Sequence, residues 1–252
     1  MIIQYCSDLH LEFNENSEYL KINPLQPVGD ILLLAGDVVP LGRINEHPWF
    51  FDFVSREFET VYWVPGNHEY YGFDISTKSK SFKEEIRSNV FLVNNCAVTH
   101  GDVRLIFSSL WSKISPLNER DIRQGMADFH LIKYGNARFT PDHYNHLHHE
   151  AKAFLSETLK QKAQGKNIVV SHHVPTLMNY PEKYKGTTLN EAFAVELFDF
   201  IADSGPDYWI YGHHHQSVPT FRIGRTGLIT NQLGYVRRGE HYDFKENQTI
   251  AV

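Results

Sequence analysis

Five short apolar runs in this sequence end in side chains that can bind metal ions or move protons. They stand in the segments 1–8, 30–37, 60–69, 167–175 and 208–215. Apolar runs of this length that stop at polar or turn residues are typical of buried strands. Amphipathic segments stand between several of them. The sequence therefore predicts an α/β chain in which strands alternate with helices.

Polar residues follow each of these runs directly. In open α/β sheets, ligands bind at the carboxyl ends of the strands, so we expect these side chains to face one shared crevice. Side chains two apart in an extended segment lie on the same side. Asp8 and His10 could therefore bind one ion together, and so could His213 and His215. The middle histidine, His214, would face away, either toward supporting side chains or toward solvent.

Each of these short motifs has an ordinary structural explanation when it is taken alone. Asp-x-His is a common accident, Gly-Asp and Gly-Asn commonly form turns, and His172-His173 would suit a cap or a hydrogen-bonded pair. Independent accidents do not fall at the ends of five strand-like runs in one chain. The joint pattern therefore favours a functional site.

Two further segments have amphipathic patterns, and three are rich in β-forming residues. Residues 45–58 and 75–89 fit helices, and the second would present its charged residues on a solvated face. The segments 89–95, 97–111 and 217–231 are short, β-rich and interrupted by turn residues. They predict antiparallel strands.

Two more helices are predicted from their start and stop signals. Thr140 is placed to cap a helix and Pro141 suits its first turn, so a helix should run from there to about residue 164. A capping-box pattern at Thr188 and Glu191 begins another. The Gly205-Pro206 pair should end it.

Length and composition set the organisation. The chain has 252 residues, enough for a continuous core, and no linker or internal repeat divides it. We expect a single domain over residues 1–252, with 112–139 as a long surface excursion near the active site. The sequence leaves the oligomeric state open.

Charge and cysteine content limit the partners and the compartment. The net charge is −6 and no block of Lys or Arg stands out, which argues against a groove for nucleic acid. Cys6 and Cys96 make no disulfide framework, and Cys6 fits a small buried apolar residue. The apolar run 31–35 is too short to span a membrane, and Asp8 interrupts any leader peptide. We therefore expect a cytoplasmic protein without a membrane partner.

The ordered set of motifs resembles the calcineurin-like metallophosphoesterase superfamily. The motifs are Asp-x-His, Gly-Asp, Gly-Asn-His-Glu, apolar-apolar-Ser-His and Gly-His-x-His, in the order of that family, over residues 8 to 215. "SDLHLEF" and "GNHEYY" are similar to segments of small single-domain bacterial phosphohydrolases. The resemblance implies an α/β fold in which a two-sheet β-sandwich is flanked by helices on both sides. It also implies a dinuclear metal centre.

The resemblance assigns a role to each block. One metal ion would be held by Asp8, His10 and His215, and the other by Asn67, His172 and His213, with Asp37 bridging the two. His172 is chosen over His173 because it stands directly after "VVS", where the family has its ligand. His68 would be the histidine that binds no metal and meets the phosphate and its leaving group.

Two departures from related enzymes restrict the resemblance. Purple acid phosphatases have a tyrosine ligand three residues after the bridging aspartate. Protein Ser/Thr phosphatases have an aspartate at the same position, where it partners the catalytic histidine. This chain has Pro40 at that position, so the partner of His68 is not identified. Lipid A-pathway hydrolases that share "SDLHL" carry arginine at the place of His68, which makes them a poorer match.

These residues suit hydrolysis of a phosphodiester or of a small phosphorylated metabolite. Two divalent ions neutralise the phosphate oxygens and lower the pKa of bound water, so attack by metal-bound hydroxide is expected, with His68 as a general acid that assists the leaving group. Mixed imidazole and carboxylate ligands suit Mn, Fe, Zn or Co. Glu69 could orient His68 or cap the following turn, and the second role is favoured because adjacent side chains seldom face each other. The alternative function is a catalytically retired scaffold of the same fold that binds a protein partner.

The substrate side is less clear in the sequence. The loops 70–80, 112–139 and 176–188 are expected to set specificity. Six residues could line that side, since arginine recognises phosphate and aromatic rings stack on bases, but packing on the surface or in the core is the favoured explanation for each. They are Tyr70, Tyr71, Trp111, Arg120, Arg123 and His130.

Overall fold

Two six-stranded sheets pack face to face in the computed structural model of this chain, which describes residues 1–161 and 165–252. In the first sheet the strands lie in the order β14-β1-β2-β3-β5-β4, and in the second the order is β12-β13-β11-β10-β7-β6. The bounds in the first sheet are β1 (Ile2–Cys6), β2 (Ile31–Leu34), β3 (Thr60–Trp63), β4 (Phe82–Arg87), β5 (Val90–Asn94) and β14 (Thr249–Ala251). Those in the second are β6 (Cys96–His100), β7 (Val103–Ser108), β10 (Lys166–Ser171), β11 (Tyr208–Ile210), β12 (Phe221–Ile223) and β13 (Thr226–Ile229).

Each sheet has a parallel centre and antiparallel edges. The strands β1, β2, β3 and β5 run parallel, and β14 and β4 close the two edges in the opposite direction. The second sheet repeats this plan, with β7, β10, β11 and β13 parallel and β6 and β12 at its edges. The carboxyl ends of eight strands therefore point to one end of the sandwich.

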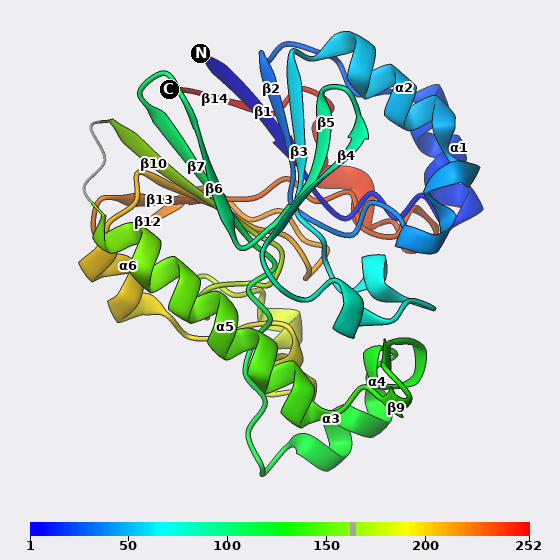
Figure 1. The fold of residues 1–252 in the computed structure, drawn as a ribbon, viewed down its shortest axis with the longest axis vertical. Coiled ribbons are helices and arrows are strands. Elements are labelled where there is room, and N and C mark those ends of the chain that lie inside the picture. The colour runs from blue at the N-terminus through cyan, green and yellow to red at the C-terminus, as the bar shows by residue number, and fades with distance from the viewer. Residues whose placement is uncertain (162–164) are drawn as a thin grey trace.

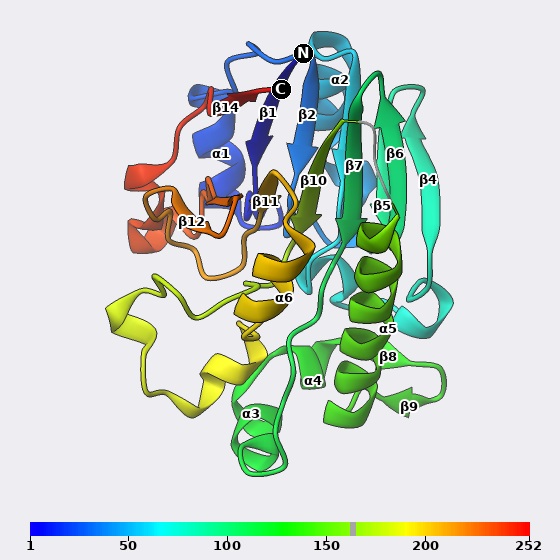
Figure 2. The same ribbon diagram turned by 90° about the vertical axis from the view of Figure 1, so that its left-hand side faces the viewer.

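Helices cover the outer face of each sheet. The helices α1 (Asn14–Ile22) and α2 (Pro48–Glu57) pack on the first sheet, and α5 (Pro141–Lys160) and α6 (Phe198–Ser204) pack on the second (Figures 1 and 2). In β2, Ile31 and Leu33 lie between the sheets, whereas Leu32 and Leu34 face the helices. Strands buried on both faces need such continuous apolar runs. The predicted two-sheet sandwich flanked by helices is confirmed.

The expected excursion at 112–139 forms a layer of its own below the second sheet. It contains α3 (Glu119–Gly125), α4 (Asp128–Leu131) and the short pair β8 (Lys133–Tyr134) and β9 (Ala137–Arg138), which lie around the amino-terminal end of α5 (Figure 2). Trp111, Ile122 and Phe129 are buried there against Tyr144 of α5. This small apolar cluster holds the excursion beside the end of the sandwich to which the parallel strands point.

The helix predicted at 75–89 is wrong. Residues 75–77 form one 3-10 turn, and 82–87 form the edge strand β4, antiparallel to β5. Phe82 and Ile86 pack toward the cluster beneath α2, and their spacing of four residues fits a helical face as well as alternate positions of a strand. The segment becomes a strand because it pairs with the exposed edge of β5. A sequence pattern does not show which edges are free to pair.

The helix predicted from Thr188 to Gly205 is only partly right. A 3-10 turn covers Thr188–Ala192, the chain is then extended, and α6 begins at Phe198. The backbone of Val174 bonds Phe193 and Val195, which holds this stretch extended. Gly205 ends α6 in the left-handed conformation at a φ of 51°, as its sequence position predicted.

Other expectations hold in the described residues. α2 falls within the predicted 45–58, and α5 starts at the Thr140 cap, with a capping box to His143. The last residues predicted for that helix, 162–164, lie outside the described residues. Cys6 is buried, and neither it nor Cys96 forms a disulfide. Within the described ranges, no helix combines the length and apolar character that crossing a bilayer requires.

Candidate metal centre

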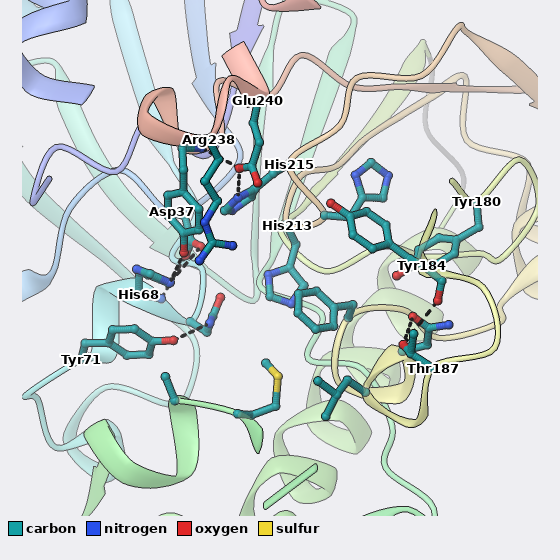
Figure 3. A pocket seen from close by; sticks show the side chains of 18 residues that line it. Asp37, His68, Tyr71, Tyr180, Tyr184, Thr187, His213, His215, Arg238 and Glu240 are labelled. Carbon is teal, nitrogen blue, oxygen red and sulfur yellow. Dashed lines mark hydrogen bonds and ion pairs between the residues drawn. The ribbon is translucent and has the colours of Figure 1, made fainter. Parts of the chain in front are cut away.

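The seven residues that the resemblance proposed as ligands all lie at the carboxyl ends of parallel strands. Asp8 and His10 follow β1, Asp37 follows β2, Asn67 follows β3, His172 follows β10, and His213 and His215 follow β11. Both sheets contribute, so segments more than 200 residues apart meet at one place. Figure 3 shows Asp37, His213 and His215 around a common space, with His68 beside them.

One group of donor atoms comes from Asp8, His10, Asp37 and His215, and all of these atoms lie within 4.8 Å of one another. The Nε2 atoms of His10 and His215 are 2.9 Å apart. Asp37 Oδ2 is 3.6 Å from His10 Nε2, and Asp8 Oδ1 is 3.5 Å from His215 Nε2. These side chains are nearly or completely buried.

A second group comes from Asp37, His172 and His213 and meets the same 4.8 Å limit. His172 Nε2 lies 2.9 Å from His213 Nδ1, 3.4 Å from Asp37 Oδ1 and 3.2 Å from Asn67 Oδ1. Asp37 thus offers one carboxylate oxygen to each group. The Asp37 carboxyl is buried, yet the neighbouring histidines hold its pKa well below the usual value.

The outer nitrogen of each imidazole has an acceptor. His172 Nδ1 donates to the Ala35 carbonyl at 2.9 Å, and His213 Nε2 to the Ala192 carbonyl at 3.2 Å. The other two imidazoles donate to carboxylates. His10 Nδ1 donates to Glu12 at 3.2 Å, and His215 Nδ1 donates to Glu240 at 2.8 Å. A neutral imidazole that donates from one nitrogen has a lone pair on the other. When the four rings are neutral, four lone pairs therefore converge in this small volume.

The backbone at these positions is unusual. Asp8, His10, Asp37, His213 and His215 have φ values of 57°, 47°, 54°, 81° and 53°. The left-handed region is disfavoured for residues with a Cβ, and such strain is characteristic of functional sites. These residues are therefore not in extended segments. Asp8 and His10 do lie in one donor group, but His213 and His215 belong to different groups, so the expected pairing of those two histidines is wrong.

Two glycines allow the strand ends to approach. A Cβ on Gly36 would lie 2.3 Å from His172 Nδ1, and a Cβ on Gly66 would lie 2.2 Å from Asp37 Oδ1. Gly36 also has a φ of 91°, which favours glycine. The glycines of Gly-Asp and Gly-Asn-His are thus required by the packing of the donor groups.

Glu69 is fully buried and organises the loops instead of touching His68. Its carboxylate accepts from the backbone N–H groups of Gly66, Asp37 and Val38 and from the indole of Trp63, at 2.6 to 3.0 Å. It thereby joins the turn after β3 to the turn after β2. This supports the structural role for Glu69, in a form more extensive than the expected cap.

His68 has a carboxylate partner that the sequence interpretation missed. Glu12 Oε1 accepts from His68 Nδ1 at 2.7 Å and lies 3.2 Å from His10 Nδ1. Burial alone would lower the pKa of His68, but the carboxylates of Asp37 and Glu12 raise it to about 9. Glu12 stands in "SDLHLEF", two residues after His10, and this position was the available signal. It supplies the carboxylate that is absent at Pro40.

Asp128 supports Asn67 from the excursion. Its Oδ1 accepts from Asn67 Nδ2 and from the Tyr71 hydroxyl, each at 2.8 Å. This bond fixes the amide nitrogen of Asn67 on the outer side, so that the amide oxygen faces His172. Asp128 is completely buried, and no sequence signal marked it.

The two neighbouring histidines point elsewhere. His173 Nδ1 donates to the Ser109 carbonyl at 3.1 Å, and its ring contacts Trp111. His214 is buried and its Nδ1 lies 3.1 Å from the amide nitrogen of Gln232. Of the two roles left open for His214, the supporting one fits and exposure to solvent does not.

The residues expected on the substrate side divide between two places. Tyr71 lines a cavity of about 420 Å³ beside the donor groups, whereas Tyr70 and Trp111 are buried in the cluster beneath it. Arg120, Arg123 and His130 line a separate groove with Arg138. The cavity is instead completed by residues from the loops 112–139 and 176–188 and from the carboxyl-terminal segment, including Tyr235 and Arg238.

A sequence model of the calcineurin-like phosphoesterases matches residues 1–217 of this chain. The chain belongs to the calcineurin-like phosphoesterase family. This phosphoesterase is a metal-dependent phosphoric ester hydrolase, as predicted, and its buried His and Asp groups could hold metal ions.

The phosphoesterase is similar to a viral protein and, over part of its length, to a mycobacterial phosphodiesterase. It is 29% identical over 271 residues to "Uncharacterized protein L509" of Acanthamoeba polyphaga mimivirus, covering 96% of this chain and 94% of the viral protein. A shorter stretch of 64 residues, 25% of this chain and 19% of the relative, is 42% identical to the acyl-carrier-protein phosphodiesterase PptH of Mycobacterium tuberculosis. The crystal structure of the phosphopantetheinyl hydrolase PptH has the same fold, with a TM-score of 0.72 at 19% identity, covering 98% of this chain and 95% of the other.

Proposed function

We propose that this phosphoesterase binds two divalent metal ions and hydrolyses a phosphodiester or another small phosphate ester. Asp8, His10 and His215 would hold one ion, Asn67, His172 and His213 the other, and Asp37 would bridge the two. The observation that carries the proposal is the pair of inward nitrogen–nitrogen distances of 2.9 Å. Since the outer nitrogens donate to fixed acceptors, the inner nitrogens of the neutral rings would present lone pairs to each other, and a metal cation between them would accept both.

The charge of the donor set suits this chemistry. Asp8 and Asp37 bring two negative charges and the remaining donors are neutral, so two divalent ions would leave a net charge of about +2 for an anionic substrate. Bound ions of this kind neutralise phosphate oxygens and lower the pKa of a coordinated water. Nitrogen and oxygen donors together suit Mn, Fe, Zn or Co.

His68 would supply the proton for the departing alkoxide. Its Nδ1 is held by Glu12, and its Nε2 faces the cavity, 4.0 Å from Asp37 Oδ2. Glu12 keeps the ring oriented and favours its charged form, so the Nε2 proton is available at neutral pH. In this arrangement Asp37 would join the two donor groups. His68, which lies beside them, would donate its proton to the leaving group.

PptH is named for phosphodiester chemistry, which supports a diester as the substrate class here. The alternative, a catalytically retired scaffold for a protein partner, keeps the sandwich but does not need the complete donor set. This chain has all seven donors in one place. The enzyme is therefore the better-supported function.

Metal analysis and turnover test the proposal together. The purified protein is stripped with a chelator, reloaded with Mn, Fe, Zn or Co, and assayed on an aryl phosphodiester and an aryl phosphomonoester. Two metal equivalents per chain and restored hydrolysis are expected. Stoichiometric metal binding without hydrolysis of any ester would favour the scaffold, and failure to bind metal would contradict the proposal.

A further inference from the structure

The cavity beside the donor groups has two ends of different chemistry. Its catalytic end is formed by Asp37, Asn67, His68 and His215, and its other end by a wall of largely apolar side chains. Figure 3 shows His68 and Tyr71 on one side of the space, Tyr180 and Tyr184 on the other, and His213 between them. We name the second end the apolar wall, and it consists of Met126, Tyr180, Tyr184, Leu189 and Phe193.

The apolar wall is anchored to the metal-binding end through His213. The ring of Phe193 stacks on that of His213, with centroids 4.7 Å apart and planes at 27°. His213 in turn contacts His172, and His172 contacts Asp37, which lies between His172 and His68. Phe193 and His68 are therefore at opposite ends of one row of contacts.

Because His68 and Phe193 stand at opposite ends, the two alcohol groups of a bound diester would lie in different parts of the cavity. If His68 protonates the departing oxygen, the leaving group lies on the side of His68 and Tyr71. The group that stays on the phosphate then extends toward Phe193 and Tyr184. A monoester has no such group and would leave the apolar wall without contact.

The charge of the lining restricts that retained group. Among the described residues that line the cavity, Arg238 is the only lysine or arginine, and its guanidinium lies over the Tyr235 ring at 5.1 Å, away from the apolar wall. Lys183, whose Nζ lies 4.6 Å from the centroid of the Tyr184 ring, does not line the cavity, so a carboxylate or a second phosphate against the apolar wall would be desolvated without a lining cation. The apolar wall therefore favours an uncharged group.

Hydrogen-bonding groups at the rim permit some polarity. Thr187 donates its hydroxyl to the side-chain oxygen of Asn190 at 3.0 Å, which orients the Asn190 amide nitrogen away from that bond. Both residues line the cavity, so this amide can donate to a carbonyl or hydroxyl oxygen. A volume of about 420 Å³ is within the range of cavities that enclose an organic ligand larger than phosphate.

We infer that this enzyme prefers phosphodiesters whose retained alcohol group is large, uncharged and mostly apolar, and that the apolar wall binds this group. The inference rests on the proposed function, because it takes His68 as the proton donor. Tyr184 and Leu189 are the specificity-determining residues at the rim of the cavity.

A matched substrate series tests the inference. p-Nitrophenyl phosphodiesters keep one leaving group while the retained group changes from methyl to hexyl, and to a chain of the same length that ends in a carboxylate. With the Mn-loaded enzyme, kcat/KM should rise at least tenfold from methyl to hexyl, mainly through KM, and should fall again for the carboxylate. Equal values across the series, or a preference for the carboxylate, would overturn the inference.

Variants and a binding measurement separate the apolar wall from the chemistry. Tyr184→Ser combined with Leu189→Ser should abolish the advantage of hexyl over methyl, whereas Leu177→Ser, in the same loop, 45% exposed and outside the lining, should keep it. In chelator, calorimetry should show tighter binding of hexyl methylphosphonate than of methyl methylphosphonate, by at least fivefold, only when Tyr184 and Leu189 are present.

The two proposals can fail independently. If no metal supports hydrolysis of any ester but the binding difference remains and depends on Tyr184 and Leu189, the apolar wall stands and the proposed function fails. If the esters are hydrolysed but neither kinetics nor binding distinguishes hexyl from methyl, the inference fails and the proposed function stands.

Discussion

Single residues at this site are fixed by partners outside the donor set. Each of the four imidazoles donates one N–H to a carbonyl or carboxylate, and Asn67 donates its amide to Asp128. Such outer partners set the tautomer and ring orientation of metal-binding histidines. The ring nitrogens that face inward are therefore determined before any ion binds.

Removal of a proposed ligand should separate activity from folding. Asp37→Ala and Asn67→Ala should lose metal-stimulated hydrolysis, because Asp37 serves both donor groups and Asn67 completes the second. Both variants should stay folded, since the sandwich core lies elsewhere. Circular dichroism and metal analysis check this, and full activity in either variant would show that the ligand assignment is wrong.

Glu12 should act through His68. Glu12→Gln should lower kcat by about 10- to 100-fold at saturating metal, the size expected when a partner that orients a reactive group is lost. The loss should be greater for an alkyl leaving group than for p-nitrophenol, which departs without a proton. His68→Ala should show the same dependence on leaving group. Equal losses for both substrates would mean that Glu12 has another role.

The sequence pattern predicted the donor residues but not the groups that hydrogen-bond to them. Asp8, His10, Asp37 and the rest could be predicted because they stand at strand ends in a recognisable order. Asp128 and Glu240 could not, because they come from segments whose positions depend on tertiary packing. The Ala35 and Ala192 carbonyls are backbone groups, which no residue pattern reports.

At the scale of elements, the strand ends and their turns carry the site. The five strands were predictable from continuous apolar runs, because strands buried on both faces need them. β4 was not, because Phe82 and Ile86 fit both periods and only the free edge of β5 selects the strand. The extended stretch before α6 was missed for the same reason, since it depends on a distant partner, Val174.

Gly66 should be intolerant of any side chain. Gly66→Ala would place a Cβ 2.2 Å from Asp37 Oδ1, so the turn after β3 must move and the second donor group opens. Metal stoichiometry should fall, and the free energy of unfolding should drop by about 1–3 kcal/mol, as for other overpacked sites. Gly42→Ala is the matched control, because nothing lies within 4 Å of its Cβ. Unchanged metal binding in Gly66→Ala would contradict this account.

The helix α5 should contribute to acid sensitivity through His148. This side chain is 2% exposed and donates from Nδ1 to the Trp111 carbonyl at 2.6 Å, and burial lowers its pKa to about 4. The unfolded chain, with the ordinary value of 6.5, takes up the proton first as the pH falls. Stability should therefore be fully present above pH 6.5 and decline as the pH falls toward 4.

The lowering of the His148 pKa from 6.5 to about 4 corresponds to at most about 3.4 kcal/mol of stability. Denaturant unfolding in chelator at pH 7, 5.5 and 4.5 measures it. His148→Gln should show a shallower decline over this window than the unchanged protein, because glutamine can donate but does not titrate. Parallel curves would remove His148 as a cause of the decline.

At the scale of the whole molecule, two sheets with parallel centres bring distant segments to one end of the sandwich. Residues after β1, β2 and β3 meet residues after β10 and β11 there, and the excursion and the loop 176–188 add the walls of the cavity. The family resemblance predicted this architecture. The sequence did not predict which residues form the apolar wall opposite His68, because that depends on how the loops pack.

Anomalous diffraction from crystals grown with manganese tests the central claim most directly. Data collected on both sides of the Mn absorption edge should show two peaks flanking the Asp37 carboxylate, about 3.5–4 Å apart, the separation typical of two-metal sites. One peak should lie among Asp8, His10 and His215, and the other among Asn67, His172 and His213. The account would be contradicted by crystals soaked to saturation that show a single peak, or peaks remote from Asp37.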